Sequence, residues 1–578
     1  MTVVIVGAGI GGLVTALRLH HEGLDCEVYE QSEQIRELGV GLNALPNAVK
    51  ELAVLGLLDW LEELGVRTSE LFYTHRLGHE ILRRPCGMQA GFSYPQLSIH
   101  RGQLQGVLLR AVRERLGPDA VRTGHRLVGF EQDARGVRAD FVGRRGEALD
   151  PAHGAVLAAA DGIHSTVRSL LFPEEGPPCW NGVMMWRGAT DWPEFGTGRS
   201  MIIAGGTAAK LVIYPIGQGR DPGTMLTNWA VCIGTGRPGD PPPQRQDWSR
   251  RADPAGLEPH VGRFRTPLLD HAELITATRE CFEFPMCDRN PLPYWTQGRV
   301  TLLGDAAHPM YPMGSNGAGQ AILDATSLSG HLARHADPAD ALQAYQYDRL
   351  PATGEVVLRN RKGGPESVID EVERRAPEGF SRLEDVIDSA TLEAIVNSYA
   401  HASGSSPEQV TRVDPNNIPQ PIRKTHRGDV MGERSGPFWD GVEGRAPIPR
   451  AAATLGWEFI DADVEKGTIE VAFKATEDFT NPAGNVLGAF LAAMLYDTVG
   501  PALLATLKPG QFQSTLQFSV NFLRPVRPGR IVGKGRVVHR NGDLAYLSAT
   551  LNGSGKTIIA TASATARVID LDQAPLAP

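Results

Sequence analysis

The fold of the first half of the chain is decided near its N-terminus by Val3-Val4-Ile5-Val6-Gly7-Ala8-Gly9-Ile10-Gly11-Gly12, which leads into a helical pattern of leucines. The β-branched run predicts a strand, the glycines a tight turn, and the leucines a helix. Gly7 allows the turn, Gly9 lets the backbone approach a pyrophosphate, and Gly12 permits close helix packing. The helix N-terminus adds N–H groups and positive potential, so the stretch predicts a dinucleotide-binding unit.

A second strand, Cys26 to Glu30, ends in an acidic residue about 20 residues beyond the turn, where a carboxylate hydrogen-bonds a ribose hydroxyl. The turn alone does not separate FAD from NAD. Only one such glycine motif occurs, so we expect no second domain of this kind to hold a nicotinamide.

Three downstream segments favour the flavin through their resemblance to a known family as well as through their chemistry. The first is Ile99-His100-Arg101-Gly102-Gln103-Leu104, the second is the stretch 160–168 around Asp161-Gly162, and the third begins with Gly304-Asp305 and continues to Gly317. In the third, a strand ends at Gly304, Asp305 suits a ribityl hydroxyl, and a helix begins near Gly317. The N–H groups of that helix would stabilise the negative charge of a reduced flavin.

Together these segments resemble the class A flavoprotein monooxygenases. The stretch 310–317, Gly364-Pro365-Glu366 and Arg374-Arg375-Ala376-Pro377 are similar to the phenazine-hydroxylase-like group, and the resemblance covers about Met1 to Val413. It implies an FAD cofactor reduced by a transient NAD(P)H, and oxygen transfer from a C4a-hydroperoxyflavin to an aromatic or heteroaromatic acid, with loss of a ring carboxylate as one alternative.

The resemblance also assigns roles to particular residues. Arg101 would contact the FAD phosphates or the flavin edge, with Gln105 one helical turn further on. Asp161 would act on both FAD and the nicotinamide. Pro312 would form a rigid wall near the site of oxygen addition. His164 and His308 are interpreted as structural, because this chemistry does not require a histidine base.

Alternating runs between the second and third segments predict an antiparallel sheet inserted at about 176–285. In the family, such a sheet carries the aromatic substrate. Trp186, Arg187, Tyr214 and Trp229 are candidate pocket residues, since aromatic faces pack a flat ring and Arg187 can pair with a carboxylate. The alternative is that the aromatic residues belong to the core.

Beyond residue 413 the pattern changes. Residues 414–440 are rich in Pro, Asn, Gly and charge, which indicates a linker. Residues 441–573 then combine one apolar helix, around Leu487 to Leu504, with several strands and the hairpin signal Asn541-Gly542. We therefore expect an α/β chain with three parts: a Rossmann-like FAD-binding domain, an antiparallel β-sheet substrate domain and an α+β hotdog domain.

This last domain resembles the phenylacetic-acid-type acyl-CoA thioesterases through Asn481, Gly484, Leu487-Gly488-Ala489 and the stretch 522–529. In that family, water attacks a thioester whose carbonyl lies against a helix N-terminus, here near Gly488, and an acidic residue of the helix assists. The expected acid position is Tyr496, and the carboxylate of Asp497 lies one residue later, about 100° around the helix.

Three interpretations of this domain stay open. It hydrolyses an aryl thioester through Asp497, either in support of the monooxygenase or as the centre of a thioesterase-centred bifunctional enzyme. It binds an acyl group without cleaving it, or it only pairs chains into a homo-oligomer. Arg524, Arg527 and Arg530 are candidates for a CoA phosphate or, alternatively, belong to a solvated loop.

Composition limits the function classes. The net charge of −9 gives no general reason to bind nucleic acid or an anionic membrane. The six cysteines lack metal-type spacing, so we expect no metal site, and no run approaches the roughly 20 apolar residues of a membrane span. A cytoplasmic enzyme acting on a small aromatic molecule, free or linked to CoA or a carrier, is the expectation.

Overall fold

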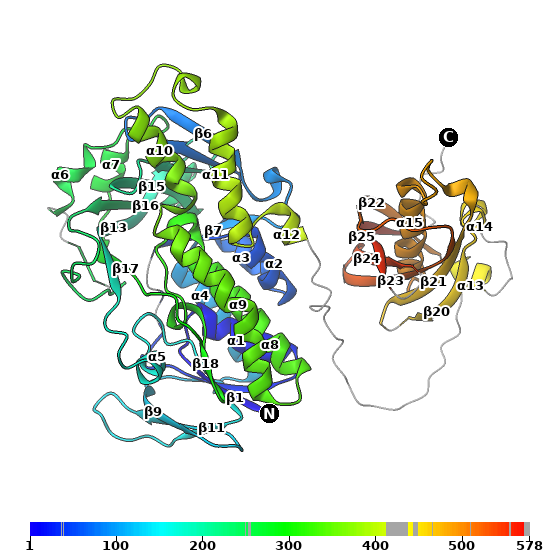
Figure 1. The fold of residues 1–578 in the computed structure, drawn as a ribbon, viewed down its shortest axis with the longest axis horizontal. Coiled ribbons are helices and arrows are strands. Elements are labelled where there is room, and N and C mark those ends of the chain that lie inside the picture. Colours follow the sequence, from blue (N-terminus) through cyan, green and yellow to red (C-terminus); the bar gives the residue numbers. More distant parts are fainter. Residues whose placement is uncertain are drawn as a thin grey trace. The chain divides into compact units, whose positions relative to one another are not determined.

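The structure is a computed structural model that describes residues 1–35, 37, 40–248, 250–252, 256–411, 437–442, 449–464, 466–508, 510–553 and 557–570. The chain divides into two compact units, 1–422 and 423–578 (Figure 1). Each unit has its own hydrophobic core, as expected for a chain too long for a single one.

A six-stranded sheet forms the base of the first unit. Its order is β18(Thr296–Gln297), β19(Val300–Leu302), β12(Val156–Ala159), β1(Thr2–Val6), β2(Asp25–Tyr29) and β8(Val121–Arg122). All neighbours are parallel except β18 and β19. Val3, Val4 and Ile5 are fully buried, which explains why β1 is an unbroken apolar run: a parallel strand is covered on both faces.

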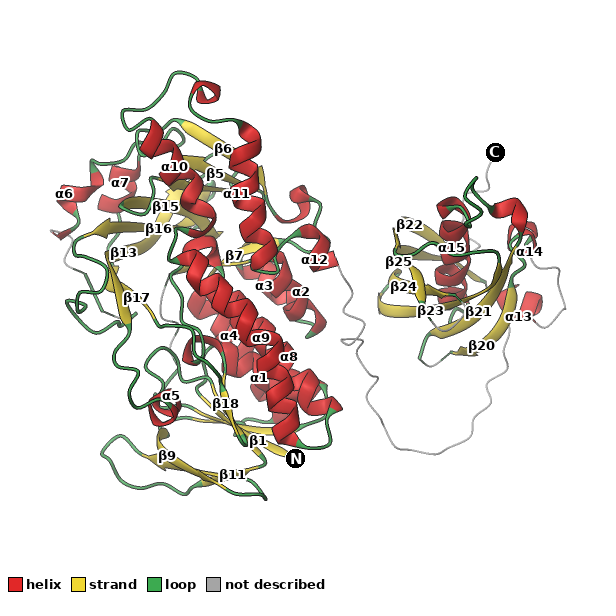
Figure 2. Cartoon of the chain, viewed as in Figure 1, coloured by secondary structure: helices red, strands yellow, loops and turns green. Residues whose placement is uncertain are grey.

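Four helices pack together beside this sheet (Figure 2). They are α1(Ile10–His21), α4(Arg101–Leu116), α8(Gly317–Arg334) and α9(Pro338–Asn360). The predicted strand-turn-helix from Val3 is confirmed, and α8 begins at the predicted Gly317. Helix α1 packs against both α4 and α8, so the two segments carrying Arg101 and Gly317 come to the same turn.

The predicted inserted sheet is confirmed, and it is larger than expected. Its order is β17(Cys281–Asp288), β13(Cys179–Pro193), β16(Thr224–Gly234), β15(Ala209–Gln218), β14(Ser200–Ala204), β5(Glu70–Thr74) and β6(Glu80–Pro85). The last two strands come from the segment before Arg101 and were not predicted to join it. They do so through a parallel pairing of β14 with β5.

Two three-stranded sheets and several shorter helices complete the first unit. The sheets are β3(Gly41–Ala44), β7(Gln96–His100), β4(Val66–Thr68) and β11(Ala152–Gly154), β10(Val137–Val142), β9(Arg126–Gln132). The helices are α2(Pro46–Val54), α3(Leu58–Leu64), α5(Thr166–Leu171), α6(Glu258–Val261), α7(His271–Thr276), α10(Ser367–Arg375), α11(Ser389–Ala402) and α12(Pro407–Thr411).

The second unit is one helix against an antiparallel sheet. Helix α15(Gly488–Leu504) packs on a sheet whose order is β20(Glu458–Asp463), β21(Thr468–Ala475), β23(Gly529–Asn541), β24(Leu544–Asn552), β25(Ile558–Asp570) and β22(Gln511–Phe522), and it contacts every strand from β21 to β22 in that order. Leu491, Leu495 and Val499 are buried on the helix face toward the sheet. The predicted apolar helix, the hairpin at Asn541-Gly542 and the expected arrangement of one helix against an antiparallel sheet are confirmed.

The predicted linker, 414–440, lies outside the described residues as far as 436. Its last residues belong to α13(Pro437–Val442), which is followed by α14(Arg450–Thr454). Trp439 is buried and its indole N–H donates to the carbonyl of Ala505 at 3.2 Å, so packing ties these residues to the second unit.

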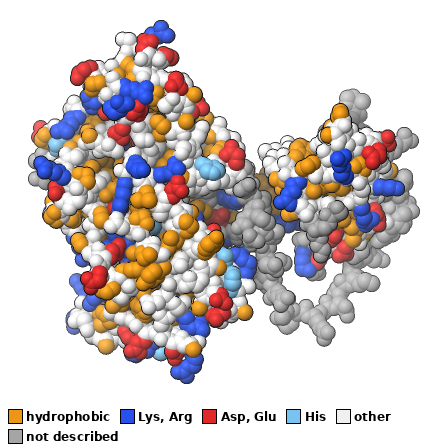
Figure 3. All heavy atoms as spheres, viewed as in Figure 1, with side chains coloured by type: hydrophobic (Ala, Val, Ile, Leu, Met, Phe, Trp, Pro, Cys, Tyr) orange, Lys and Arg blue, Asp and Glu red, His pale blue; other side chains and the backbone are white. Residues whose placement is uncertain are grey.

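The surface of the first unit mixes charges of both signs. On the face drawn in Figure 3, Lys and Arg side chains stand among Asp and Glu side chains. Within the described residues, no helix is long and apolar enough to cross a membrane, and no group of His, Cys, Asp and Glu side chains is arranged to hold a metal ion.

Candidate functional site

The glycine turn has the geometry that a dinucleotide requires. Gly7 has φ of +103°, where side chains are rare, and its N–H donates to the carbonyl of Tyr29 at 2.7 Å. A Cβ on Gly12 would collide with the carbonyl oxygen of Gly7, so α1 can approach β1 this closely only without a side chain. A Cβ on Gly9 would meet no protein atom within 4 Å, because Gly9 faces a pocket.

Glu30 and Gln105 lie at this turn, as predicted. The Glu30 carboxylate accepts the N–H groups of Ala8 at 2.9 Å and Ser32 at 2.8 Å, and the Gln105 amide donates to the carbonyl of Ala8 at 2.8 Å. A carboxylate anchored by backbone N–H groups at the end of β2 is placed for a ribose. Gln105 fixes the turn itself and does not line the pocket.

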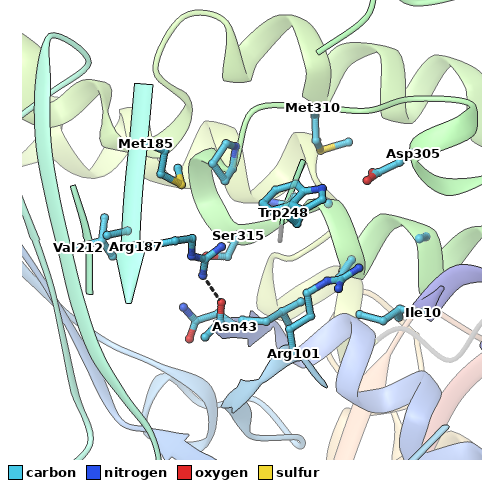
Figure 4. A pocket seen from close by; sticks show the side chains of 18 of the residues that line it. Ile10, Asn43, Arg101, Met185, Arg187, Val212, Trp248, Asp305, Met310 and Ser315 are labelled. Carbon is cyan, nitrogen blue, oxygen red and sulfur yellow. Dashed lines mark hydrogen bonds between the residues drawn. The ribbon is translucent and has the colours of Figure 1, made fainter. Parts of the chain in front are cut away.

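The pocket lies between the glycine turn and the inserted sheet (Figure 4). One wall contains Gly9, Gly11, Asp305 and the beginning of α8; the other contains side chains of β13, β15 and β16. Of the residues predicted from the sequence, the pocket brings together Gly9, Arg101, Asp305, Pro312 and Gly317.

The N-terminus of α8 opens on the pocket. Residues 315–318 line it, and the helix runs for 18 residues from Gly317. The Asn316 side chain does not cap the helix and binds Tyr399 instead, so the first N–H groups of α8 are free of a side-chain cap. Ser315 has φ of +57°, a left-handed conformation that turns the chain between Pro312 and the helix.

Arg101 and Asp305 both line the pocket. Arg101 begins α4, and its side chain donates no hydrogen bond to the described residues. Burial lowers the pKa of Arg101, whereas the nearby Asp305 raises it. Asp305 is exposed toward the pocket, but the protein covers its other sides. This burial raises the pKa of Asp305 more than the nearby His308 and Arg101 lower it. Arg101, a cation without a hydrogen bond to the described part of the protein, suits a phosphate. Asp305, a carboxylate exposed to the pocket, suits a hydroxyl.

Asp161 has a structural contact that the sequence did not predict. One carboxylate oxygen accepts the N–H of Thr166 at 2.8 Å, at the beginning of α5, and the other is buried without a partner. Burial raises the pKa of Asp161. Its neighbours Ala160 and Gly162 line the pocket, but Asp161 does not. Its assignment to FAD and nicotinamide stays a prediction.

Two of the four predicted substrate-sheet side chains face the pocket. Arg187 and Tyr214 line it, whereas Trp186 binds Glu283 at 3.2 Å and Trp229 binds Thr278 at 2.8 Å in the core. The indoles are therefore core residues. Arg187 donates to the carbonyl of Gly41 at 2.5 Å, and its Nε is buried without a hydrogen-bond partner.

The sequence analysis missed an ion pair in the same pocket. Lys210 of β15 donates to the carboxylate of Glu366, and both side chains line the pocket although they are almost fully buried. Burial works against the ammonium, yet Glu366 outweighs it and holds the pKa of Lys210 above its usual range. The second Glu366 oxygen accepts the N–H of Gly314 at 3.2 Å. The two residues are 156 positions apart, so no local pattern could reveal them.

The two histidines that were interpreted as structural make contacts within the protein. His308 contacts the buried Asp324 at 2.5 Å, and Asp324 also accepts from Arg349 at 2.9 Å. Burial alone would raise the pKa of Asp324, but His308 and Arg349 lower it to about 2. His164 contacts the carbonyl of Gln246 at 3.0 Å. Neither histidine lines the pocket.

In the second unit, the predicted catalytic residues lie on or next to α15 but not at one point. Gly488 begins the helix, and Asn481 accepts the N–H groups of Ala483 and Asn485 in a turn before it. Asp497 is nine residues beyond Gly488, about 13 Å along the helix. One oxygen of Asp497 is buried without a partner, and burial raises its pKa.

Tyr496, at the position where the acid was expected, is exposed and packs edge-on against Phe518 at 5.3 Å. Of the three arginines considered for a CoA phosphate, Arg527 donates to the carbonyl of Ala483 and Arg530 pairs with Glu458. These two contacts account for both side chains within the unit itself.

Comparison with known proteins agrees with this geometry. The FAD binding domain family matches residues 1–185 and 273–360, and the thioesterase superfamily matches residues 483–553. Phenazine 1,6-dicarboxylic acid hydroxylase of Lysobacter antibioticus is 41% identical over 407 residues, which are 69% of this chain and 96% of the relative. The chain belongs to the class A flavin monooxygenases.

Two further relatives of these monooxygenases are similar to the first unit. 3-Hydroxybenzoate 6-hydroxylase 1 of Aquipseudomonas alcaligenes is 32% identical over 62% of this chain and 87% of its own length. The crystal structure of a Klebsiella pneumoniae HpxO variant complexed with FAD matches with a TM-score of 0.55 and 25% identity, over 71% of this chain and 100% of that one. The expected fold class and the expected monooxygenase activity are thus confirmed.

The residues of the pocket fit FAD, the cofactor of this monooxygenase family. Gly9 leaves open space where a pyrophosphate approaches, and a Cβ on Gly12 would close the turn. Glu30 suits the ribose, Asp305 the ribityl chain, and the N-terminus of α8 a reduced flavin ring. NAD(P)H is the reductant typical of these hydroxylases.

Proposed function

We propose that the first unit hydroxylates an aromatic or heteroaromatic carboxylic acid, with Arg187 holding the carboxylate. The observation that carries this proposal is the environment of Arg187. It lines the pocket from the sheet side, its Nε is buried without a partner, and no carboxylate of the described residues pairs with it. A buried cation without a counter-ion is costly, so an anionic substrate group would compensate it.

The chain's own residues would divide the work as follows. Gly9, Gly12 and Glu30 hold the dinucleotide, while Asp305 orients the ribityl chain. The N–H groups at the start of α8 stabilise negative charge on the ring system and Pro312 limits the space beside it. Bound FAD would supply the redox chemistry between NAD(P)H and dioxygen. Met185, Met201 and Ile203 give the opposite wall an apolar surface that suits a flat ring and excludes water.

The test is to screen aromatic acids for stimulated NAD(P)H oxidation while the mass of the product is measured, so that peroxide formation is not mistaken for hydroxylation. Arg187→Met should raise KM for an acid by about 10- to 100-fold, the worth of one charge-assisted hydrogen bond. The matching carboxamide should lose far less. Arg83→Met, in the same sheet outside the pocket, is the control. Equal losses for acid and amide would contradict the role of Arg187.

We also propose that the second unit pairs two copies of the chain. Strand β22 is an edge of its sheet, and Phe512, Leu516 and Phe522 on it are 42%, 54% and 54% exposed. An exposed apolar edge strand is a natural site for pairing. Light scattering after size-exclusion chromatography should give a dimer for the whole chain and a monomer for a chain ending at residue 422. The same oligomeric state for both would refute this proposal.

A thioesterase activity of the second unit on aryl thioesters is supported by the unpartnered oxygen of Asp497. Since Asp497 and the N-terminus of α15 are about 13 Å apart along one helix, the two would act together only across a pair of chains. Release of free CoA from aryl thioesters, lost in Asp497→Asn, is the expected result. No release from any aryl thioester would leave binding or pairing as the role of this unit.

A cytoplasmic location, where NAD(P)H is present, completes the proposal and is tested by cell fractionation.

A further inference from the structure

Five charged side chains line the pocket of the first unit, and on one of the cations no carboxylate of the described residues acts. They are Arg101, Arg187, Lys210, Asp305 and Glu366. Lys210 pairs with Glu366, and Arg101 and Asp305 act on each other electrostatically beside the glycine turn. Arg187 is the remaining cation, and among the described residues no carboxylate faces it. The sheet side of the pocket therefore offers one free positive charge.

Lys210 and Arg187 lie at different places on the same face of the sheet. Lys210 on β15 pairs in register with Cys232 on β16, which pairs with Met185 on β13. Arg187 is two residues beyond Met185. One step of two residues and two strand spacings separate their Cα atoms by about 12 Å. A polycyclic aromatic acid held at Arg187 could thus extend toward Lys210.

Glu366 is fixed where it lies. Its carboxylate binds Lys210 with one oxygen and the N–H of Gly314 with the other, and only 4% of the residue is exposed. The ammonium of Lys210 also contacts the Met313 sulfur at 2.9 Å. A second substrate carboxylate at Lys210 would either lie beside the carboxylate of Glu366, with like charges in contact, or displace Glu366 and leave it buried with the Gly314 N–H alone. Separating a buried ion pair in this way is strongly unfavourable. A neutral substituent leaves the pair intact.

We propose that the Lys210–Glu366 pair determines substrate specificity: it closes one end of the pocket to a second anionic group, so that the enzyme accepts aromatic monocarboxylic acids and rejects those with a second carboxylate at that end. This inference rests on the proposed function, in which Arg187 binds the first carboxylate. It predicts that this enzyme rejects a dicarboxylic acid such as the one in the name of the Lysobacter relative.

The test measures binding of phenazine-1-carboxylate and phenazine-1,6-dicarboxylate to the holoenzyme through the change in flavin absorbance. The wild type should bind the monocarboxylate at least about 10-fold more tightly than the dicarboxylate, because the second carboxylate would lack one charge-assisted contact. Glu366→Gln frees the ammonium of Lys210, so the preference should fall by about 10-fold or more. A wild type that binds both acids equally, or a preference unchanged in Glu366→Gln, would overturn the proposal.

Two further variants separate specificity from structure. Lys210→Gln/Glu366→Gln removes both charges, so its preference for the monocarboxylate should return to that of the wild type. Because it leaves no unpaired buried charge, this variant also serves as the test if Glu366→Gln alone folds poorly. A double variant that keeps the lowered preference would count against the charge argument. Glu70→Gln removes a buried carboxylate of the same sheet that lies outside the pocket, and should leave the preference unchanged.

The outcome also distinguishes this inference from the function on which it rests. If neither acid perturbs the flavin or stimulates NAD(P)H oxidation in the wild type, and no other aromatic acid does so, the proposed function fails together with the inference. If the monocarboxylate binds and is hydroxylated while the preference does not respond to Glu366→Gln, only the specificity inference fails.

Discussion

Replacing Gly9 by alanine should weaken FAD binding without weakening the fold. Gly9 has φ of −70° and ψ of −179°, which alanine adopts without strain, and an added Cβ would meet no protein atom within 4 Å. Such a substitution restricts the unfolded chain, which favours folding by roughly 0.4–1 kcal/mol. Gly9 is also the N-cap of α1, where alanine is less favourable than glycine by a comparable amount, so the stability of the apoprotein should change little. The methyl group would instead occupy the space of the pyrophosphate. Losing one charge-assisted backbone hydrogen bond costs about 1.5–3 kcal/mol, which is an affinity loss of about 10- to 100-fold.

Two measurements on the same preparation compare the stability of the apoprotein with its affinity for FAD. Apoprotein stability comes from urea unfolding after the flavin has been removed, and affinity from titration with FAD followed by flavin fluorescence. Gly129→Ala is a matched control, since Gly129 also has free space around a Cβ but lies in β9, outside the pocket. A Gly9→Ala apoprotein less stable than the wild type by clearly more than about 1 kcal/mol, or one with unchanged FAD affinity, would refute the assignment of this turn.

Three more predictions concern charge and independence. The carboxylate of Asp324, with its pKa lowered to about 2, contributes on the order of 2 kcal/mol to the free energy of unfolding above pH 4, and this contribution is lost as the pH falls toward 2. In urea unfolding, the difference in stability between the wild type and Asp324→Asn should therefore shrink over that interval. A constant difference would contradict the role of the ionised carboxylate. Burial raises the pKa of Asp497, so its charge destabilises the fold at neutral pH; Asp497→Asn should raise Tm at pH 7 and have little effect below about pH 4, and an unchanged Tm would contradict this. The chain ending at residue 422 should still bind FAD and oxidise NAD(P)H when an aromatic acid is added, because the glycine turn and pocket lie within it; loss of FAD from a folded truncation would show that the second unit is needed.

The parts of the site that the sequence predicted are those built from short stretches. The turn from Gly7 to Gly12 is local, because its glycines are required by contacts within a few residues and with the adjacent strand. The beginning of α8 at Gly317 followed from a strand end, a glycine-rich turn and an apolar helix in direct succession. Such local patterns determine the structure of the segments in which they occur, so the sequence alone was sufficient to predict these segments.

The parts that were missed depend on contacts between distant segments. Lys210 and Glu366 lie on different elements, and β5 enters the sheet by pairing with a strand that begins 130 residues later, at Ser200. One error was avoidable. Trp186 and Arg187 are neighbours on a strand and must point to opposite faces, so they could not both line the pocket.

The most direct test of the central claim supplies the purified FAD-loaded enzyme with NAD(P)H, an aromatic carboxylic acid and isotopically labelled dioxygen. A hydroxylase of the kind described here should form a product that carries one labelled oxygen atom, in proportion to the NAD(P)H consumed, and this coupling should fall in Arg187→Met. Consumption of NAD(P)H with the label found only in hydrogen peroxide or water, for every aromatic acid tried, would contradict it.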